Sequence, residues 1–221
     1  MIQKNTSELR QSIIDACLWM NSSGLNQGTS GNISIRTDEG ILITPTSLPY
    51  EETRPEDIVL LPGDGLSGDV VGHHRPSSEW RFHVNIYKER DDIHSVVHAH
   101  STYATALSML RRDIPSVHYM IGIFGGDSIR CADYAHYGSQ ELSNNALIAL
   151  KDRTGCLLGT HGMIACGGDL KQATWRAEEL EALCQQYHLA CQLGEPHVLT
   201  AQQIVEVRER METGYGVWPM E

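Results

Sequence analysis

The chain has 221 residues, of which 41% are hydrophobic and 20% are charged, and its formal net charge is −11. This composition excludes an intrinsically disordered protein, and the length predicts one domain that buries its own core. An acidic chain without a basic run argues against a nucleic-acid or membrane-surface partner. Apolar runs fall short of the ~20 residues of a membrane helix, and the N-terminus lacks an apolar signal core. We therefore expect a cytoplasmic protein whose cysteines are reduced.

The spacing of apolar residues predicts helices and short strands interleaved along the chain. A helix over 8–21 ends at Gly24, and a hairpin of 32–36 with 41–44 and a strand over 58–61 follow it. Further helices are predicted over 76–90, 102–110, 138–151, 169–193 and 200–212, and further strands over 95–98, 119–124, 156–159 and 163–166. This order predicts a single α/β domain over 1–221, with three α/β/α layers around a mixed, largely antiparallel sheet.

Three histidines form the first chemical signal. His98 and His100 stand two apart on a predicted strand, so their side chains point to the same face and can reach one ion. Two histidines at this spacing on a strand are also common as polar side chains that bind no metal. His161 lies in a Thr-His-Gly turn between two apolar strands, where its ring can project from the end of the sheet. Three histidines without a cysteine suit a zinc ion that keeps an open coordination position, which is typical of catalysis.

Glu79 and three small polar loops form the second signal. Glu79 is either a first-turn acid that stabilises a helix or a carboxylate beside the metal that moves protons. Ser77 and Ser78 precede it at a helix start, where free N–H groups favour anions. Each of the loops 28–32 and 44–47 alone is merely a turn. Together with the two serines they can cradle a phosphate without Lys or Arg.

Several segments, taken in order, resemble class II (zinc) sugar-phosphate aldolases of the fuculose-phosphate aldolase type. The resemblance extends from about residue 8 to 210. It rests on GLNQGTSGNIS, ITPTSLPYE, PSSEWRFH, VVHAH, IPSVHYM, GGDSI and THGMIAC. It implies a three-layer α/β/α domain and a homotetramer with active sites at subunit interfaces.

The resemblance also implies roles for individual residues. One zinc ion per subunit would be held by His98, His100 and His161, and the catalytic Glu79 can also approach the metal. Tyr119 would act in the active site of a neighbouring subunit. The phosphate pocket would comprise Gly31, Asn32, Thr46, Ser47, Ser77 and Ser78.

Three positions depart from the family pattern. Ser47 stands where the fuculose type has glycine, and it adds a hydroxyl near the expected phosphate. Tyr137 stands where a phenylalanine wall is expected. The C-terminal tail, 206–221, is expected near the active site but is shifted by about one residue. Tyr137 and Tyr215 are therefore candidates for selecting the aldehyde.

The implied reaction is reversible retro-aldol cleavage of a ketose 1-phosphate to dihydroxyacetone phosphate and a small aldehyde such as lactaldehyde. Tyr119 would accept the proton of the C4 hydroxyl, and Glu79 would deliver a proton to the carbon left behind. L-Fuculose 1-phosphate is the first choice of substrate, and 5-deoxyribulose or 5-methylthioribulose 1-phosphate is the alternative. A pentulose-phosphate 4-epimerase is disfavoured, because epimerases carry aspartate in place of Glu79 and HTH in place of HAH. A methylthioribulose-phosphate dehydratase and a non-catalytic scaffold of the adducin kind are the remaining alternatives.

Overall fold

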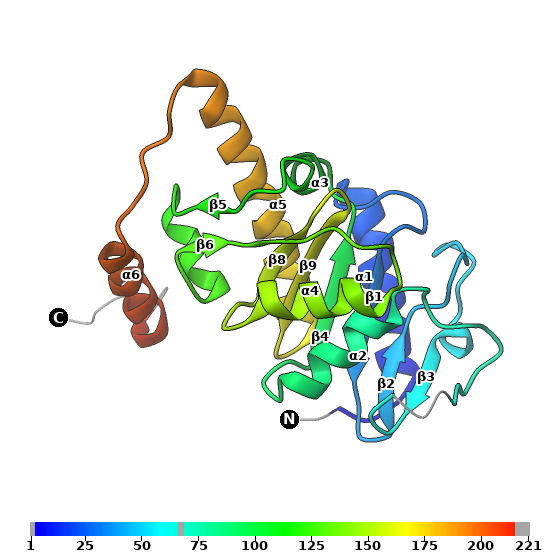
Figure 1. Ribbon diagram of the computed structural model, residues 1–221. Helices are drawn as coiled ribbons and strands as arrows, with labels where there is room; N and C mark the ends of the chain where they lie inside the picture. Colours follow the sequence, from blue (N-terminus) through cyan, green and yellow to red (C-terminus); the bar gives the residue numbers. More distant parts are fainter. Residues whose placement is uncertain (1–2, 66–68, 215–221) are drawn as a thin grey trace.

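A seven-stranded sheet forms the centre of the computed structural model, which describes residues 3–65 and 69–214 (Figure 1). The strand order is β3-β2-β1-β4-β9-β8-β7, and every neighbouring pair is antiparallel except β7 and β8, which are parallel. The prediction of a mixed, largely antiparallel sheet is confirmed. The strands are β1 (Asn32–Arg36), β2 (Gly40–Ile43), β3 (Val59–Pro62), β4 (Ser95–Ala99), β7 (Cys131–Ala132), β8 (Gly155–Leu158) and β9 (Gly162–Gly167).

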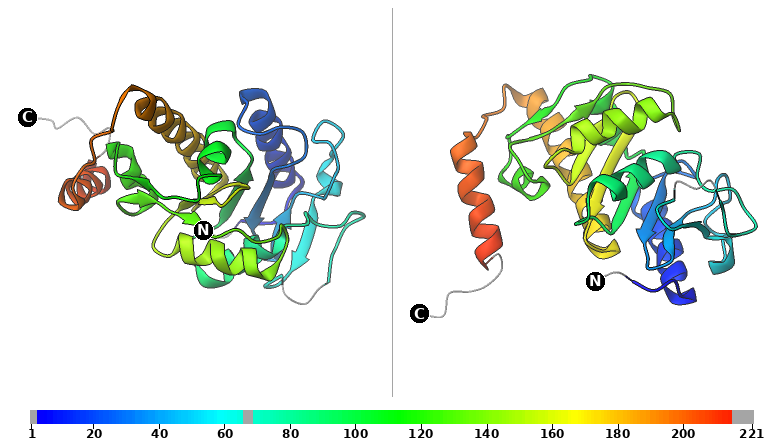
Figure 2. Two further views of the ribbon diagram at one scale, coloured as in Figure 1. Left: turned by 45° about the horizontal axis from the view of Figure 1, so that its top comes forward. Right: turned by 60° about the horizontal axis from the view of Figure 1, so that its bottom comes forward.

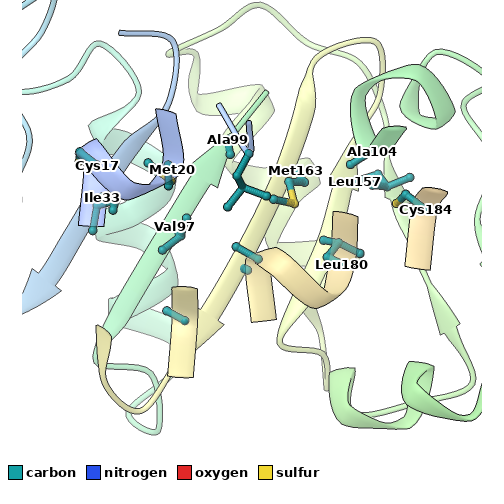
Figure 3. Close-up of a cluster of buried hydrophobic side chains, with 14 of the residues drawn as sticks. Cys17, Met20, Ile33, Val97, Ala99, Ala104, Leu157, Met163, Leu180 and Cys184 are labelled. Atoms are coloured by element: carbon teal, nitrogen blue, oxygen red, sulfur yellow. The ribbon is translucent and has the colours of Figure 1, made fainter. Parts of the chain in front are cut away.

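Helices cover both faces of this sheet (Figures 1 and 2). Successive residues of a strand point to opposite faces, so Val97 of β4 packs into one core and Val96 into the other. Figure 3 shows the first core, to which Val97 contributes from the sheet and Leu180 from a helix. The three-layer prediction is thereby confirmed. Helices α1 (Ser7–Ser23), α3 (Thr102–Ser108) and α5 (Leu170–Leu193) cover the first face, and α2 (Trp80–Glu89) and α4 (Gln140–Leu150) cover the second.

Local capping explains where the long helices begin and end. The Thr6 hydroxyl accepts a hydrogen bond from the Leu9 N–H at the start of α1, and Gly24 ends that helix with a left-handed φ of 80°. The Asp169 side chain accepts from the Gln172 N–H at the start of α5. Each such N-cap stabilises its helix by about 1 kcal/mol. The predicted bounds of both helices agree with the structure to within a few residues.

The strand predicted over 119–124 is wrong, because this segment is a 3₁₀ helix, η2 (Tyr119–Phe124). The His118 ring accepts from the Met120 N–H and Gly125 ends the turn with a φ of 95°. A short apolar run that is buried on several sides has no periodicity that separates a strand from a helix. Helix α6 (Ala201–Gly214) packs against η2, at a distance from the main sheet (Figure 1). The remaining short elements are η1 (Pro55–Asp57) and the two-stranded pair β5 (Ile114–Pro115) and β6 (Ser128–Ile129).

The register of three central strands gathers distant residues at one edge of the sheet. Asn32, at the start of β1, lies opposite His98 near the end of β4. Ala99, the last residue of β4, lies opposite Met163 near the start of β9. The residues that flank these strand ends, among them His161, therefore meet at the same place.

Over the ranges 3–65 and 69–214, no helix combines the length and apolar character needed to cross a membrane. All six cysteines fall within these ranges and none forms a disulfide.

Candidate metal centre and active-site cavity

Three imidazoles converge at the edge where β4 ends and β9 begins. The centroids of the His98, His100 and His161 rings lie 4.8 to 4.9 Å apart. His98 Nδ1 donates to the Met163 carbonyl at 2.8 Å, so the neutral His98 ring carries a lone pair on Nε2. His100 Nε2 lies 3.0 Å from that nitrogen. Two nitrogen lone pairs at this distance repel each other unless a proton or a cation lies between them.

Glu79 completes the cluster with a carboxylate that is 5% exposed. Its Oε2 lies 3.1 Å from His98 Nε2, and its Oε1 lies 3.2 Å from His161 Nε2. Oε2 also accepts a hydrogen bond from Asn32 Nδ2 at 3.0 Å. Oε1 is buried without a partner in hydrogen-bond geometry among the described residues.

The position of Glu79 on its helix decides between the two interpretations of this residue. Glu79 is the N-cap of α2, one residue before the first turn, and its side chain makes no capping hydrogen bond. The expectation that α2 begins earlier, with capping hydroxyls before its first turn, is corrected accordingly. The carboxylate points to the histidines instead of the helix end, which its backbone conformation, with φ of −101° and ψ of 11°, permits.

The electrostatics of the cluster keep the carboxylate ionised. Burial alone would raise the pKa of Glu79, but the charges of His98 and His161 and their contacts hold that pKa well below its usual range. Burial likewise acts to lower the pKa of His98, and the adjacent Glu79 charge raises it above the usual value. Burial and the neighbouring histidines lower the pKa of His100 to about 4, so this ring is neutral at pH 7.

The donor set fits a divalent metal ion. One ligand atom from each of Glu79, His98, His100 and His161 lies within 4.8 Å of the others. Nitrogen lone pairs and an unpartnered, buried carboxylate oxygen face one another, and a cation would satisfy both. Histidines with a carboxylate are ligands that zinc prefers.

A cavity of about 340 Å³ opens over this cluster. No Lys or Arg is among the described residues that line it. Hydroxyl and amide groups dominate the wall instead, and they come from all three of the polar loops noted in the sequence. The predicted site residues on its wall are Gly31, Asn32, Thr46, Ser47, Ser77, Ser78, Glu79, His100, His161 and Tyr137.

The polar loop of residues 28–32 packs closely against the histidines. A Cβ on Gly31 would lie 2.7 Å from the His98 carbonyl oxygen, so only glycine allows this approach. Asn26 Oδ1 accepts from the His100 N–H at 3.2 Å and from the Ser30 hydroxyl at 3.0 Å. The loop and the metal centre therefore form one connected unit.

Backbone hydrogen bonds join the polar loop of residues 44–47 to the segment that contains Ser77 and Ser78. The Ser77 N–H donates to the Thr44 carbonyl at 2.9 Å, and the Thr46 N–H donates to the Arg75 carbonyl at 3.0 Å. Ser47 adopts a left-handed φ of 59°, a conformation that favours glycine. The departure from glycine noted in the sequence thus falls at a strained position, and Ser47 is among the residues that line the cavity.

The tyrosines predicted to act in the active site do not all line the cavity. Tyr137 lines the cavity and is 73% exposed. Tyr119, at the start of η2, is 43% exposed and is not among the residues that line the cavity of its own chain. Residues 206–214 belong to α6 and also lie outside this lining, and Tyr215 lies outside the described residues.

Sequence reasoning missed three residues around this site. Tyr134 and Thr160 line the cavity, and Thr160 has a left-handed φ of 54° directly before His161. His83 lies in the protein interior, hydrogen-bonded to Asn32. The signal for His83 was its spacing, because it stands four residues after Glu79 and so on the same side of a helical turn.

Comparisons with known proteins agree with this architecture. The family model described as Class II Aldolase and Adducin N-terminal domain matches residues 11–188. L-Fuculose phosphate aldolase of Escherichia coli K12 is 46% identical over 212 residues, which cover 96% of this chain and 97% of the relative. A 5-methylthioribulose-1-phosphate/5-deoxyribulose-1-phosphate aldolase of Rhodospirillum rubrum is 45% identical over 94% of this chain and 92% of the relative.

A solved structure, L-fuculose 1-phosphate aldolase, superimposes with a TM-score of 0.89 at 37% identity and covers 94% of this chain and 97% of its own. Sequence and structural similarity both extend over nearly the whole chain. The chain therefore belongs to the class II aldolase and adducin family.

Proposed function

We propose that this chain is a zinc-dependent aldolase that reversibly cleaves a ketose 1-phosphate to dihydroxyacetone phosphate and a small aldehyde. L-Fuculose 1-phosphate, which gives lactaldehyde, is the preferred substrate. The observation that carries the proposal is the juxtaposition of the Glu79, His98, His100 and His161 cluster with a cavity walled by hydroxyl and amide groups. A metal ligand set and a wall of hydroxyl groups in the same cavity match a substrate with a carbonyl and a phosphate.

The metal would be held by His98, His100 and His161, one zinc ion per subunit. When bound, zinc supplies Lewis-acid polarisation of the substrate carbonyl. The three polar loops would bind the phosphate through Gly31, Asn32, Thr46, Ser47, Ser77 and Ser78.

In the condensation direction the ionised Glu79 carboxylate would take a proton from the reacting carbon of dihydroxyacetone phosphate, and in cleavage the protonated Glu79 would return it to that carbon. Its carboxylate is ionised, buried and oriented by Asn32, which suits a general base that acts beside a metal. Tyr119 would accept the proton of the C4 hydroxyl. Since Tyr119 does not line its own cavity, that role requires a neighbouring subunit. We accordingly propose a homotetramer with interfacial active sites in the cytoplasm.

The metal cluster and the polar loops would bind the dihydroxyacetone phosphate half, which all candidate substrates share. Discrimination between these substrates must then come from contacts with the aldehyde half. The relative from Rhodospirillum rubrum, nearly as similar as the fuculose enzymes, favours a 5-methylthioribulose or 5-deoxyribulose 1-phosphate as the second candidate. Tyr137, at the exposed rim of the cavity, and Tyr215, in the tail, are the proposed selectors. An epimerase or dehydratase is less favoured, because this chain keeps Glu79 and the HAH triplet and resembles aldolases over nearly its full length.

The deciding experiment is a steady-state comparison of kcat/KM for L-fuculose 1-phosphate, 5-deoxyribulose 1-phosphate and 5-methylthioribulose 1-phosphate. We expect cleavage to be abolished by chelation and restored by Zn²⁺, with dihydroxyacetone phosphate as the shared product. Active enzyme without bound metal would refute the zinc assignment. Light scattering should give a mass near four times 24.6 kDa, and an active monomer would refute the interfacial site. The same assay on a chain that ends at Met211 tests whether the tail sets the ranking of substrates.

A further inference from the structure

A second buried histidine lies behind the cavity and has no part in the proposed metal site. His83, on α2, is 0% exposed, and both of its ring nitrogens are hydrogen-bonded. Its Nε2 lies 2.5 Å from Asn32 Oδ1, and its Nδ1 lies 2.7 Å from the Ser34 hydroxyl. The Tyr87 hydroxyl lies 2.7 Å from the same serine oxygen and 2.8 Å from the Ser34 carbonyl oxygen, so its single proton faces two acceptors once the Ser34 hydroxyl donates to His83.

Elementary donor and acceptor rules assign a direction to each hydrogen bond that links Glu79, Asn32, His83 and Ser34. An ionised carboxylate only accepts, so Asn32 must present its Nδ2 to Glu79, where the distance is 3.0 Å. The other end of the same amide, Oδ1, is then turned to His83 and can only accept. His83 must therefore carry its proton on Nε2, and its Nδ1 must accept from the Ser34 hydroxyl.

The surroundings keep His83 in this single protonation state. Burial lowers the pKa of His83 to about 3, because the imidazolium form cannot be solvated in the protein interior. The neutral ring has one proton, and Asn32 Oδ1 requires it on Nε2. His98 donates from Nδ1 to the Met163 carbonyl, so the neutral form of that ring is the opposite tautomer.

We infer that His83 is a positioning residue that fixes the orientation of the Asn32 amide and, through it, the Glu79 carboxylate. An asparagine amide rotated by half a turn would present its oxygen to Glu79 and leave two acceptors in contact. The Nε2–H of His83 opposes that rotation, because it would then face an amide NH₂. The inference rests on the proposed function only where Glu79 is said to move a proton.

Two substitutions separate this role from simple packing. His83→Gln retains an N–H donor near the position of Nε2, whereas His83→Phe retains the ring volume beside Phe82 but has no donor. Loss of a residue that orients an active-site group costs roughly 10- to 100-fold. We expect that loss in kcat for His83→Phe, a KM change of only about threefold, and a kcat for His83→Gln clearly above that of His83→Phe. A packing role predicts the reverse order, and that order would overturn the inference.

Asn85→Ala is the matched control for damage to α2. Asn85 lies on the same helix but donates to the Ser143 hydroxyl at 2.8 Å, on the side that faces α4. We expect this variant to lower the melting temperature and leave kcat unchanged. A fall in kcat equal to that of His83→Phe would mean that any disturbance of α2 suffices, and it would overturn the specific role of His83.

A measurement on the unmodified protein needs neither substrate nor metal. Nitrogen-15 NMR of histidine-labelled, metal-free protein reports which ring nitrogen carries the proton, and comparison with His83→Gln assigns the His83 signal. We expect a protonated Nε2 and an unprotonated Nδ1. The opposite tautomer would overturn the inference even if His83→Phe fails to fold. Failure of the wild-type protein to cleave any ketose 1-phosphate would refute the proposed function and leave this result standing.

Discussion

Replacing Gly162 by alanine would insert a methyl group where β4 and β9 meet beside the metal cluster. The added Cβ would lie 2.6 Å from the Ala99 carbonyl oxygen, 3.0 Å from His100 Cδ2 and 3.4 Å from His98 Cε1. Ordinary van der Waals contact begins at 3.4 Å, so the two strand ends must separate by about 0.8 Å at the first of these contacts. His161 directly precedes Gly162 and would move with it.

Such a displacement is large for a metal site. Ligand distances in zinc centres hold to within about 0.2 Å, so His161 could no longer bind together with His98 and His100. We expect Gly162→Ala to weaken Zn²⁺ binding by roughly 10- to 100-fold or more, the range found when groups that orient ligands are lost. Overpacking should also destabilise the fold by about 1–3 kcal/mol.

Competition with a chromogenic chelator measures the zinc affinity, and urea unfolding of the metal-free protein measures the stability. Gly168→Ala is the matched control, because a Cβ there would meet its nearest neighbour, Gln172 Oε1, at 3.6 Å. We expect that variant to bind zinc normally. Wild-type zinc affinity in Gly162→Ala would refute the argument that the close approach of the two strands sets the ligand geometry.

Three further outcomes follow from the site. Glu79→Gln should lower kcat by roughly 10²–10⁴-fold with zinc retained, as measured by steady-state kinetics and metal analysis, and near-normal turnover would transfer the proton role to Tyr119. Ser47→Gly should raise KM for the sugar phosphate by about fivefold, the equivalent of one lost hydrogen bond of ~1 kcal/mol, and an unchanged KM would exclude contact of this hydroxyl with the phosphate. Burial lowers the pKa of His83 from 6.5 to about 3, so between these values the unfolded chain binds a proton that the folded chain does not. The free energy of unfolding therefore keeps its full value above pH 6.5 and falls as the pH is lowered below it, by about 2 kcal/mol at pH 5. Urea unfolding measures this loss, and His83→Gln should lose less stability over the same range.

Periodicity predicted most long elements of this fold because each buries one face. The 3.6-residue spacing of α1 and α5 and the strand alternation around β1 and β4 are signals contained within a single segment. Strands β5, β6 and β7 have two residues each, too few for any period to emerge. For η2, the contacts of α6 and the neighbouring loops decide a conformation that its apolar run leaves open.

The same distinction applies to the site. The i and i+2 spacing of His98 and His100 is local, so the sequence alone predicted that they face one ion. The pairing of Asn32 with His98 depends on the register of β1 against β4, which are separated by more than fifty residues. The spacing of His83 from Glu79 is local as well, but its link to Glu79 through Asn32 depends on that register.

The absence of Lys and Arg from the described cavity wall has a consequence for how substrate arrives. The protein carries a net charge of −11, so a doubly charged phosphate ester approaches against a repulsive field, with no basic side chain on the described cavity wall to draw it in. Dissolved salt screens that field over a Debye length of about 8 Å at physiological ionic strength. Substrate capture should therefore become faster as moderate salt is added, whereas an enzyme that steers its substrate with an arginine-lined funnel slows down. Selectivity in this cavity then comes from the directions of hydrogen bonds at short range, and the charge of the ligand contributes little until it is already inside.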